Sequence, residues 1–260
     1  MPPPSGSRTV LAFGMLATDA TGADFVMPAH ALCIVTGVLA GTIHIENDRS
    51  SWQPLPPWSI QGPQMLARRW RADPGTRVVS ILLHAYVIAE RLGQPARCFR
   101  DGWLPAGDHA GLLAAIGDGT NSSATRGTQR DARRRVRAMA ALAQARSVPI
   151  AATSLGISER ALQRLCDRDL GLPPVVLLRL MRMHRCAAQG LAHGRLTADD
   201  ALAAGYGDQA HMARDFRLLA GIRPRHLTTT DGWPMRESAA RLVPAWEDGV
   251  STKVSDSSKT

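Results

Sequence analysis

Two short stretches of the sequence place arginine and glutamine side chains on one face of a helix. In the first, the polar residues after Ser158 follow the i, i+3, i+4, i+7 spacing of such a face: Arg160, Gln163, Arg164 and Asp167. Arginine can hold a guanine edge, and glutamine an adenine edge, through two parallel hydrogen bonds. The chemistry that these residue types indicate is recognition by hydrogen bonding, with no bond made or broken.

The second stretch repeats the pattern after Asp208. Three apolar residues, Met212, Phe216 and Leu219, fall on one face of the expected helix. The residues left outside that face are Gln209, His211, Arg214 and Arg217. The corresponding apolar face of the first stretch consists of Ala161, Leu162, Leu165 and Cys166. Each expected helix therefore buries one face and presents a polar one.

Each polar-faced helix is preceded by a shorter helix and a glycine. Ser147 and Thr197 are suitable caps for the shorter helices, and Gly156 and Gly205 follow them. A helix, a tight glycine turn and a second helix make up a helix-turn-helix unit, whose second helix can enter the major groove of DNA. The alternative is an ordinary helical bundle with polar outer faces.

A long apolar segment, Pro174–Leu191, joins the two units. As a helix, its 18 residues form a rod of ~27 Å. With the width of the units added, the exposed helices could lie about one DNA turn apart, ~34 Å.

The charge is concentrated in the same part of the chain. Of the net charge of +9, residues 1–125 contribute none, because nine arginines balance nine acidic residues. Residues 126–230 carry 18 arginines against eight acidic residues. A basic segment beside a neutral one is typical of a protein that binds a polyanion such as nucleic acid. The arginines of residues 130–137 are either a solvated helix face or further phosphate contacts.

Three pieces of this region have the residues and spacing of a known family: LGISERALQRLCDRDLGLPP, RLMRMHRCAAQGLAHG and AAGYGDQAHMARDFRLLAGIRPRHL. In the last piece, Gly-Tyr-x-Asp-Gln, Arg-x-Phe and Gly-Ile-x-Pro occur at the family's spacing. Residues 147–227 thus resemble the paired helix-turn-helix domain of AraC/XylS-type transcriptional regulators. The resemblance implies a sequence-specific regulator that binds double-stranded DNA with two recognition helices in successive major grooves.

The resemblance also implies roles for individual residues. The expected base-reading positions are Arg160, Gln163, Arg164, Gln209, Ala210, His211 and Arg214. Ala210 can offer only a methyl contact, so the second unit is expected to read bases more weakly. The expected phosphate contacts are Ser158, Arg168, Arg182, Asp208, Arg217 and Arg223.

The first half of the chain has a different pattern, with short β-like runs broken by glycine and proline. The clearest runs are Ala31–Thr36, Thr42–Glu46 and Arg77–Leu83. Helices are expected over Ala85–Leu92, ending at Gly93, and over Ala106–Ile116. The sequence therefore predicts an α+β chain, with a small β-barrel ahead of an all-α domain that contains both helix-turn-helix units.

This first half is also similar to the cupin-like sensor domains that precede such paired units. The similarity implies a sensing or oligomerising domain, with a small-molecule effector and a homodimer as candidate partners. Metal-binding cupins show His-x-His with a following Glu, whereas this chain has only His44-Ile45-Glu46. Neither a metal nor another cofactor is expected.

These patterns divide the chain into four parts. We expect a sensing or oligomerisation domain over residues 1–116, a Gly/Ser/Thr-rich linker over 117–128, the paired DNA-binding domain over 129–230, and a partly disordered tail over 231–260. The cysteines show no ligand spacing, and no 18-residue apolar run exists. A cytoplasmic protein without a membrane segment is therefore expected.

An enzyme is the weaker interpretation. The sequence has no P-loop, no GxGxxG after a strand, no GxSxG and no HExxH. The adjacent Asp199 and Asp200 cannot face each other as a general acid/base pair, and helix capping accounts for them. The alternative to a regulator is a small-barrel enzyme or ligand-binding protein whose helical half mediates protein contacts.

Overall fold

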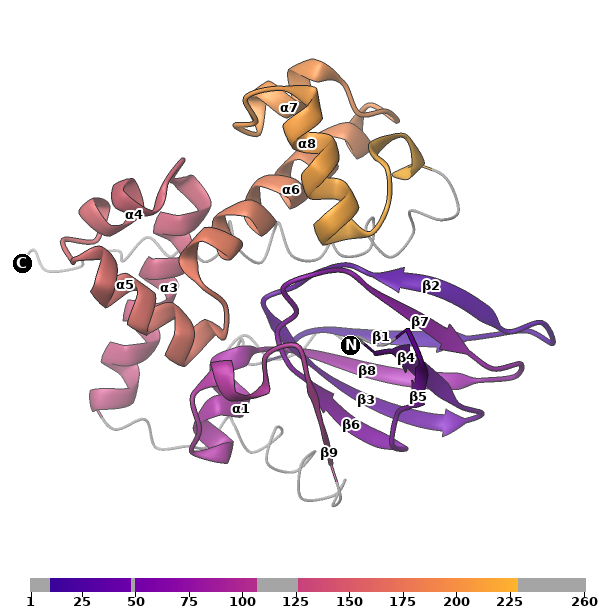
Figure 1. Cartoon of the computed structure of the whole chain (residues 1–260). Helices are drawn as coiled ribbons and strands as arrows, with labels where there is room; N and C mark the ends of the chain where they lie inside the picture. Colours follow the sequence, from indigo (N-terminus) through magenta and orange to yellow (C-terminus); the bar gives the residue numbers. More distant parts are fainter. Residues whose placement is uncertain (1–9, 48–49, 107–125, 229–260) are drawn as a thin grey trace, which may run out of the picture.

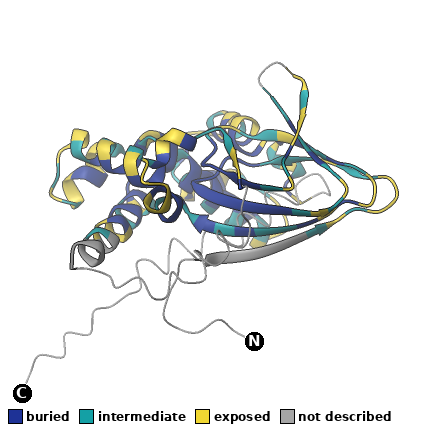
Figure 2. Cartoon of the chain, turned by 90° about the horizontal axis from the view of Figure 1, so that it is seen from below, coloured by how far each residue is buried: buried dark blue, intermediate teal, exposed yellow. Residues whose placement is uncertain are grey.

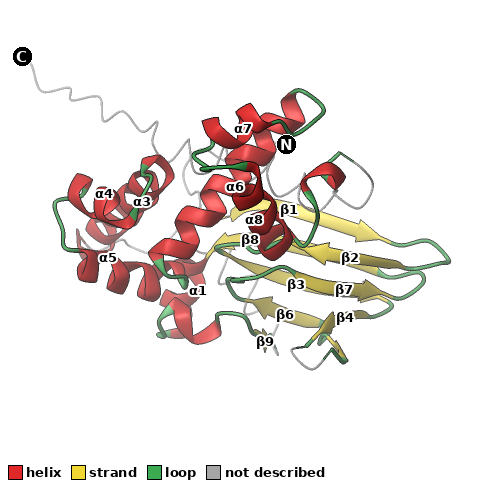
Figure 3. Ribbon diagram, turned by 45° about the horizontal axis from the view of Figure 1, so that its top comes forward, coloured by secondary structure: helices red, strands yellow, loops and turns green. Residues whose placement is uncertain are grey.

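The computed structural model describes residues 10–47, 50–106 and 126–228. Within them, residues 10–106 form a strand-rich part, called the sheet domain below, and residues 126–228 form a helical part (Figure 1). The helices gather at one end of the strands, and the hairpin loops at the other end point away from them (Figure 3). The predicted α+β class and the order of its two parts are confirmed.

The sheet domain consists of two antiparallel sheets. The first has the order β1-β8-β3-β6-β9, with β1 (Val10–Ala17), β8 (Arg77–His84), β3 (Leu32–Ala40), β6 (Trp58–Gln61) and β9 (Trp103–Pro105). The second has the order β2-β7-β4-β5, with β2 (Ala23–Met27), β7 (Arg68–Ala72), β4 (Ile43–Glu46) and β5 (Trp52–Pro54). Each of the three expected strand runs therefore overlaps one strand, β3, β4 or β8, with Ala31 and Thr42 one residue outside.

Strand β4 shows how alternation builds the layer between the sheets. Ile43 and Ile45 are buried with Trp70, Ala72 and Val78 between the two sheets. The intervening His44 and Glu46 point to the other face, where His44 lies 3.1 Å from Asp73 and Glu46 lies 3.3 Å from Arg69. The two polar members of the His44-Ile45-Glu46 motif are thus held by Asp73 and Arg69 on the outer face. Among the described residues, no group of three or more His, Cys, Asp or Glu side chains could hold a metal ion.

Helix α1 (Ala85–Leu92) has the predicted bounds and ends at Gly93, whose φ of 63° suits glycine. Its Ile88 packs with Cys33 and Val35 on the outer face of the first sheet. A short 3-10 turn, η1 (Ala96–Phe99), follows. The helix expected over 106–116 falls, apart from Ala106, outside the described residues, as does the tail after residue 228.

The helical part begins with α3 at Arg126, three residues before the expected start. Its elements are α3 (Arg126–Gln144), α4 (Val148–Ser154), α5 (Glu159–Leu165), η3 (Cys166–Leu170), α6 (Pro174–Ala192), α7 (Ala198–Ala203), α8 (Gln209–Asp215), η4 (Phe216–Ala220) and η5 (Pro224–His226). Both η3 and η4 are single π-helical turns that extend α5 and α8. None of the helices in the described part of the chain is long and apolar enough to cross a membrane.

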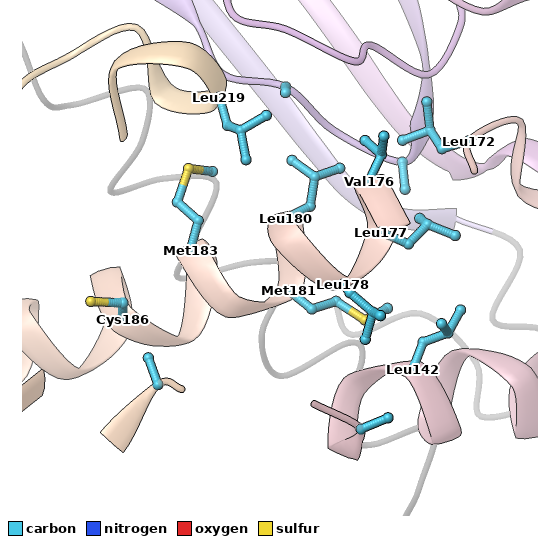
Figure 4. Packing of buried hydrophobic residues seen from close by; sticks show 14 of the residues in the cluster. Leu142, Leu172, Val176, Leu177, Leu178, Leu180, Met181, Met183, Cys186 and Leu219 are labelled. Atoms are coloured by element: carbon cyan, nitrogen blue, oxygen red, sulfur yellow. The ribbon is translucent and has the colours of Figure 1, made fainter. Parts of the chain in front are cut away.

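The largest apolar core runs through the helical part and into the sheet domain. Helix α6 is its axis: Leu177, Leu180, Met181 and Met183 are almost fully buried (Figure 4). Seen from below, the buried residues concentrate where the helices meet the strands, and the exposed ones lie at the outer ends of both parts (Figure 2). Leu32 of the sheet domain belongs to the same cluster. The two parts therefore share a continuous hydrophobic core.

Candidate nucleic-acid interface

The first helix-turn-helix unit is built from α4, a glycine turn and α5. Ser147 caps α4 by accepting a hydrogen bond from the Ile150 backbone N–H, and Gly156 turns the chain at a φ of 66°. Ser158 then caps α5 and accepts from the Ala161 N–H at 3.2 Å. These caps satisfy backbone donors that a helix start leaves unpaired. The residues at the expected apolar positions Leu162, Leu165 and Cys166 are buried.

The second unit repeats this construction with α7, a glycine turn and α8. Thr197, the expected cap of α7, forms a full capping box with Asp200, and Gly205 turns the chain at a φ of 91°. Asp208 caps α8 by accepting from the His211 N–H at 2.6 Å. Met212, Phe216 and Leu219 are buried, so the predicted inner face of this helix is confirmed.

The residues expected to read bases lie on the outer faces of α5 and α8. Five of them are exposed: Arg160, Arg164, Gln209, Ala210 and Arg214. The other two are partly held by neighbours. Gln163 donates to the Asp167 carboxylate at 2.8 Å, and the His211 ring meets the Tyr206 ring edge-on at 5.2 Å. Within the described part of the chain, Arg160 and Arg164 make no hydrogen bond or ion pair, so both guanidinium groups are available to a partner.

The expected phosphate contacts fall into two groups. The side chains of Ser158 and Asp208 are used as helix caps. Because a carboxylate cannot donate to a phosphate, only the backbone N–H of Asp208 could make such a contact.

The other four are arginines. Arg168 donates twice to Asp169, at 2.7 and 2.8 Å, and Arg182 lies over the Tyr206 ring at 5.4 Å. Arg217 and Arg223 are exposed beyond the reading face of α8.

Helix α6 fixes the distance between the two units. Its 19 residues correspond to ~28 Å, close to the length expected from sequence. Arg179 of α6 donates to the buried Asp215 of α8 at 2.7 and 3.1 Å. This ion pair ties α8 to the connecting helix, so α8 cannot move relative to α6 without breaking it. The helices expected to read bases, α5 and α8, are called the reading helices below.

The burial of Arg135 differs from what the sequence predicts. From sequence, Arg135 is placed among the solvent or phosphate contacts, and this placement is wrong. Val136 is 38% exposed, whereas Arg135 is 6% exposed. The buried stripe of Ala138, Leu142 and Ala145 leads one turn back to Arg135 rather than to Val136.

The burial of Arg135 is possible because three groups surround its charge. Its guanidinium lies 2.6 Å from Glu90 of α1, 3.3 Å from Asp169 of η3, and 4.6 Å above the Tyr86 ring. Arg135 therefore joins α1 of the sheet domain to the end of the first reading helix. The one sequence signal for the burial of Arg135 is that it lies one turn before the apolar residues Ala138, Leu142 and Ala145 on the same helix face.

The comparisons with known proteins find a family match in the helical part of the chain. Residues 151–230 match a family model described as a helix-turn-helix domain. No curated protein matches the chain. Two solved structures of ToxT from Vibrio cholerae are similar at 7% identity and a TM-score of 0.47. One covers 85% of this chain and 98% of its own, and the other, bound to a naphthalenyl-butenoic acid, covers 88% and 100%.

A third ToxT structure, of wild-type protein from Vibrio cholerae strain SCE256 with a bound unsaturated fatty acid, has 8% identity and a TM-score of 0.46, and covers 85% of this chain and 95% of its own. Scores and identities this low say nothing about ligands or sites. The identification rests on the family match and on the two capped, polar-faced units. Residues 151–230 are an AraC-type helix-turn-helix domain, and the chain is a DNA-binding transcription regulator.

Proposed function

We propose that the chain reads a DNA site in two parts, with α5 and α8 in successive major grooves and α6 holding them one DNA turn apart. The observation that carries this proposal is the pair of capped helices at opposite ends of the buried α6, each with an exposed polar face. The length of α6 supports it, because successive major grooves lie ~34 Å apart. The continuous core between the units supports a rigid spacing.

In this proposal the first unit supplies most of the base specificity. Arg160 and Arg164 are exposed and can each bind a guanine edge without giving up an internal contact. Gln163 must leave Asp167 before it can bind adenine, which lowers its net contribution. In the second unit, Gln209 and Arg214 are exposed beside Ala210, and Arg214 donates weakly to the Ala210 carbonyl at 3.3 Å.

Substitution of Arg164 tests the reading role. A duplex is first selected from a random library with the full chain, and binding is then measured by fluorescence anisotropy. Arg164→Ala is expected to cost ~1–3 kcal/mol on the selected site and to relax the preference at one base position. The matched control is Arg77→Ala, which removes another exposed arginine, from the sheet domain. If Arg164→Ala and Arg77→Ala bind alike on selected and mutated sites, Arg164 does not read a base.

We further propose that the sheet domain binds a small neutral effector. What supports this is a row of buried polar side chains on the face of β3 and β6 that is opposite to Cys33 and Val35. Thr36 donates to Gln61 at 3.2 Å, and Gln61 donates to Ser59 at 3.0 Å. All three are at most 2% exposed. Hydroxyl and amide groups recognise hydroxyl or carbonyl groups of a ligand without needing its charge.

Thermal unfolding of the full chain with a panel of medium-chain alcohols and amides tests this second proposal. A compound that binds the folded state raises Tm. The shift is expected to disappear in Thr36→Val, which keeps the side-chain shape and removes the hydroxyl. A panel without any shift, or a shift that Thr36→Val retains, would count against a ligand at this row.

A further inference from the structure

The sheet domain contacts both reading helices at corresponding positions. In each case the contact is at the glycine that follows the π-helical turn. A Cβ added to Gly171 would lie 2.8 Å from Pro63 and 3.1 Å from the Ala96 carbonyl. A Cβ added to Gly221 would lie 2.3 Å from Val26. The second contact also has backbone hydrogen bonds, because the N–H groups of Ala29 and Ala67 donate to the carbonyls of Leu219 and Leu218 at 2.7 and 3.0 Å. Figure 1 shows the end of α8 against the sheet domain at this point.

Two buried histidines meet behind this second contact. His30 lies in the segment between β2 and β3, and its backbone pairs with Gln64 in both directions. Its Nδ1 lies 3.1 Å from the Leu32 carbonyl. His184 is on the face of α6 that carries Leu177 and Leu180, and it interacts with the ring of His30 and with the backbone of Ala29. Their exposed fractions are 5% and 0%, so neither imidazole is in contact with bulk water.

The charged groups on the surrounding elements are already occupied or lie on other faces. On α8, the Asp215 carboxylate is bound by Arg179 of α6. Arg185 is also on α6, and Arg68 begins β7 beside Ala67; both have interactions of their own. Burial lowers the pKa of His184 most, and the charge of His30 lowers it further, whereas a hydrogen bond with the Ala29 backbone raises it. A second proton taken up here would therefore be repelled by the first, on the other imidazole.

We propose that His30 and His184 form an acid-sensitive latch, which holds the second helix-turn-helix unit against the sheet domain while both rings are neutral and releases it when they are protonated. The inference goes beyond DNA reading itself, and does not require that α5 and α8 bind bases. Release would free α8 and η4 from the sheet domain at the Ala29 and Ala67 hydrogen bonds. The second reading helix would then keep only its contacts within the helical part.

The direction of the effect follows from the two pKa values. Burial lowers the pKa of His30 from the ordinary 6.5 to about 4, and burial together with the charge of His30 lowers that of His184 to about 3. In the released state both rings reach water and return to 6.5. The closed contact is therefore fully stable above pH 6.5 and loses stability as the pH falls toward 4. At pH 5 each ring favours opening by about 20-fold relative to neutral pH.

Amide hydrogen exchange of the full-length protein, followed by NMR between pH 7.5 and 5, tests the latch. The reporters are the N–H groups of Ala29 and Ala67, which donate hydrogen bonds across the contact between the sheet domain and η4, called the seam below. Protection is corrected for the pH dependence of intrinsic exchange. We expect it to fall at least about tenfold at both reporters toward pH 5, while the Val35 amide inside the first sheet keeps its protection.

Two variants separate the pair from other histidines. The double change His30→Gln/His184→Gln removes both titrating rings, and the fall in protection is expected to vanish in it. His193→Gln, an exposed position in the same half of the chain, serves as the matched control and keeps the fall. His84, whose pKa burial lowers to about 4, is the rival group and is tested as His84→Gln. An unchanged wild-type protection, a fall that persists in the double variant, or one abolished by His84→Gln alone would overturn the proposal.

If the double variant does not fold, a titration of the histidines in the wild-type protein still tests the proposal. Nitrogen-15 labelling of its histidines gives the protonation state of each ring against pH. The latch requires two rings that stay neutral near pH 6 and become protonated only together with the loss of protection at Ala29 and Ala67. Eight rings that all titrate near 6.5, with the seam still closed, would contradict it.

Discussion

The orientation of the reading helices depends on two buried carboxylates. Asp215 is 1% exposed and is bound by Arg179, and Asp169 is 3% exposed and is bound by Arg135 and Arg168. Each therefore connects the end of a reading helix to another helix. Burying a carboxylate costs free energy unless it is paired, so these residues favour one arrangement of the helices over others in which the pairs would be broken.

Removal of the Asp215 side chain is expected to be costly. In Asp215→Ala, Arg179 loses its partner and α8 loses its tie to α6, and the free energy of unfolding should fall by about 2–3 kcal/mol. Urea unfolding followed by circular dichroism measures it. Asp199→Ala, an exposed aspartate in the same domain, is the control and should change stability by at most about 0.5 kcal/mol. Equal losses in the two variants would show that the Arg179–Asp215 pair does not hold the helices together.

At the level of helices and turns, each unit has one glycine in the turn between its two helices and another at the end of its reading helix. Gly156 turns the chain between α4 and α5 with open space around it, and Gly221 ends η4 against Val26. Their φ values are nearly equal, at 66° and 69°. Any side chain is therefore strained to a similar extent at both sites, and only Gly221 adds a clash with the sheet domain.

This pair of glycines allows the contact between the domains to be measured. Gly156→Ala is expected to cost about 1–2 kcal/mol from backbone strain alone. Gly221→Ala is expected to cost more, because its methyl group would push Val26 and the end of α8 apart. It should also reduce the exchange protection of Ala29 and Ala67, which Gly156→Ala leaves intact. Equal costs with an unchanged seam would mean that the sheet domain does not support the second unit.

Local signals allowed much of these elements to be predicted from sequence. The caps at Ser147 and Thr197 are each encoded within four residues, and the structure contains both. The end of α1 at Gly93 is of the same kind. The base-reading and phosphate roles stay predictions, since a polar face shows where a partner could bind and not which atoms it offers.

Long-range contacts could not be predicted in this way. Strand β1 (Val10–Ala17) is not among the runs expected from sequence, yet it is an eight-residue strand paired with β8. Burial of Arg135 depends on Glu90 and Asp169, which lie 45 and 34 residues away in the sequence. The meeting of His30 and His184 likewise depends on how the two domains pack. Periodicity shows which face of one helix or strand is buried, but it does not show which distant residues that face contacts.

On the scale of the whole molecule, the sheet domain lies at the carboxyl-terminal ends of both reading helices. The residues expected to read bases lie toward the opposite ends, near Ser158 and Asp208. With bases read by these residues, as proposed above, DNA would approach from the side that faces away from the sheet domain. The concentration of arginine in residues 126–230 gives this half of the chain the charge that such a partner requires.

The central claim is that one rigid connector makes the two units read two half-sites at a fixed spacing. It is tested most directly by anisotropy titration of the full chain against its selected duplex and against versions with 5 or 10 base pairs inserted between the half-sites. Because α6 cannot lengthen, we predict that both insertions lower the affinity to that of a duplex in which one half-site is scrambled. Affinity that survives either insertion, or that is insensitive to scrambling a half-site, would contradict the account.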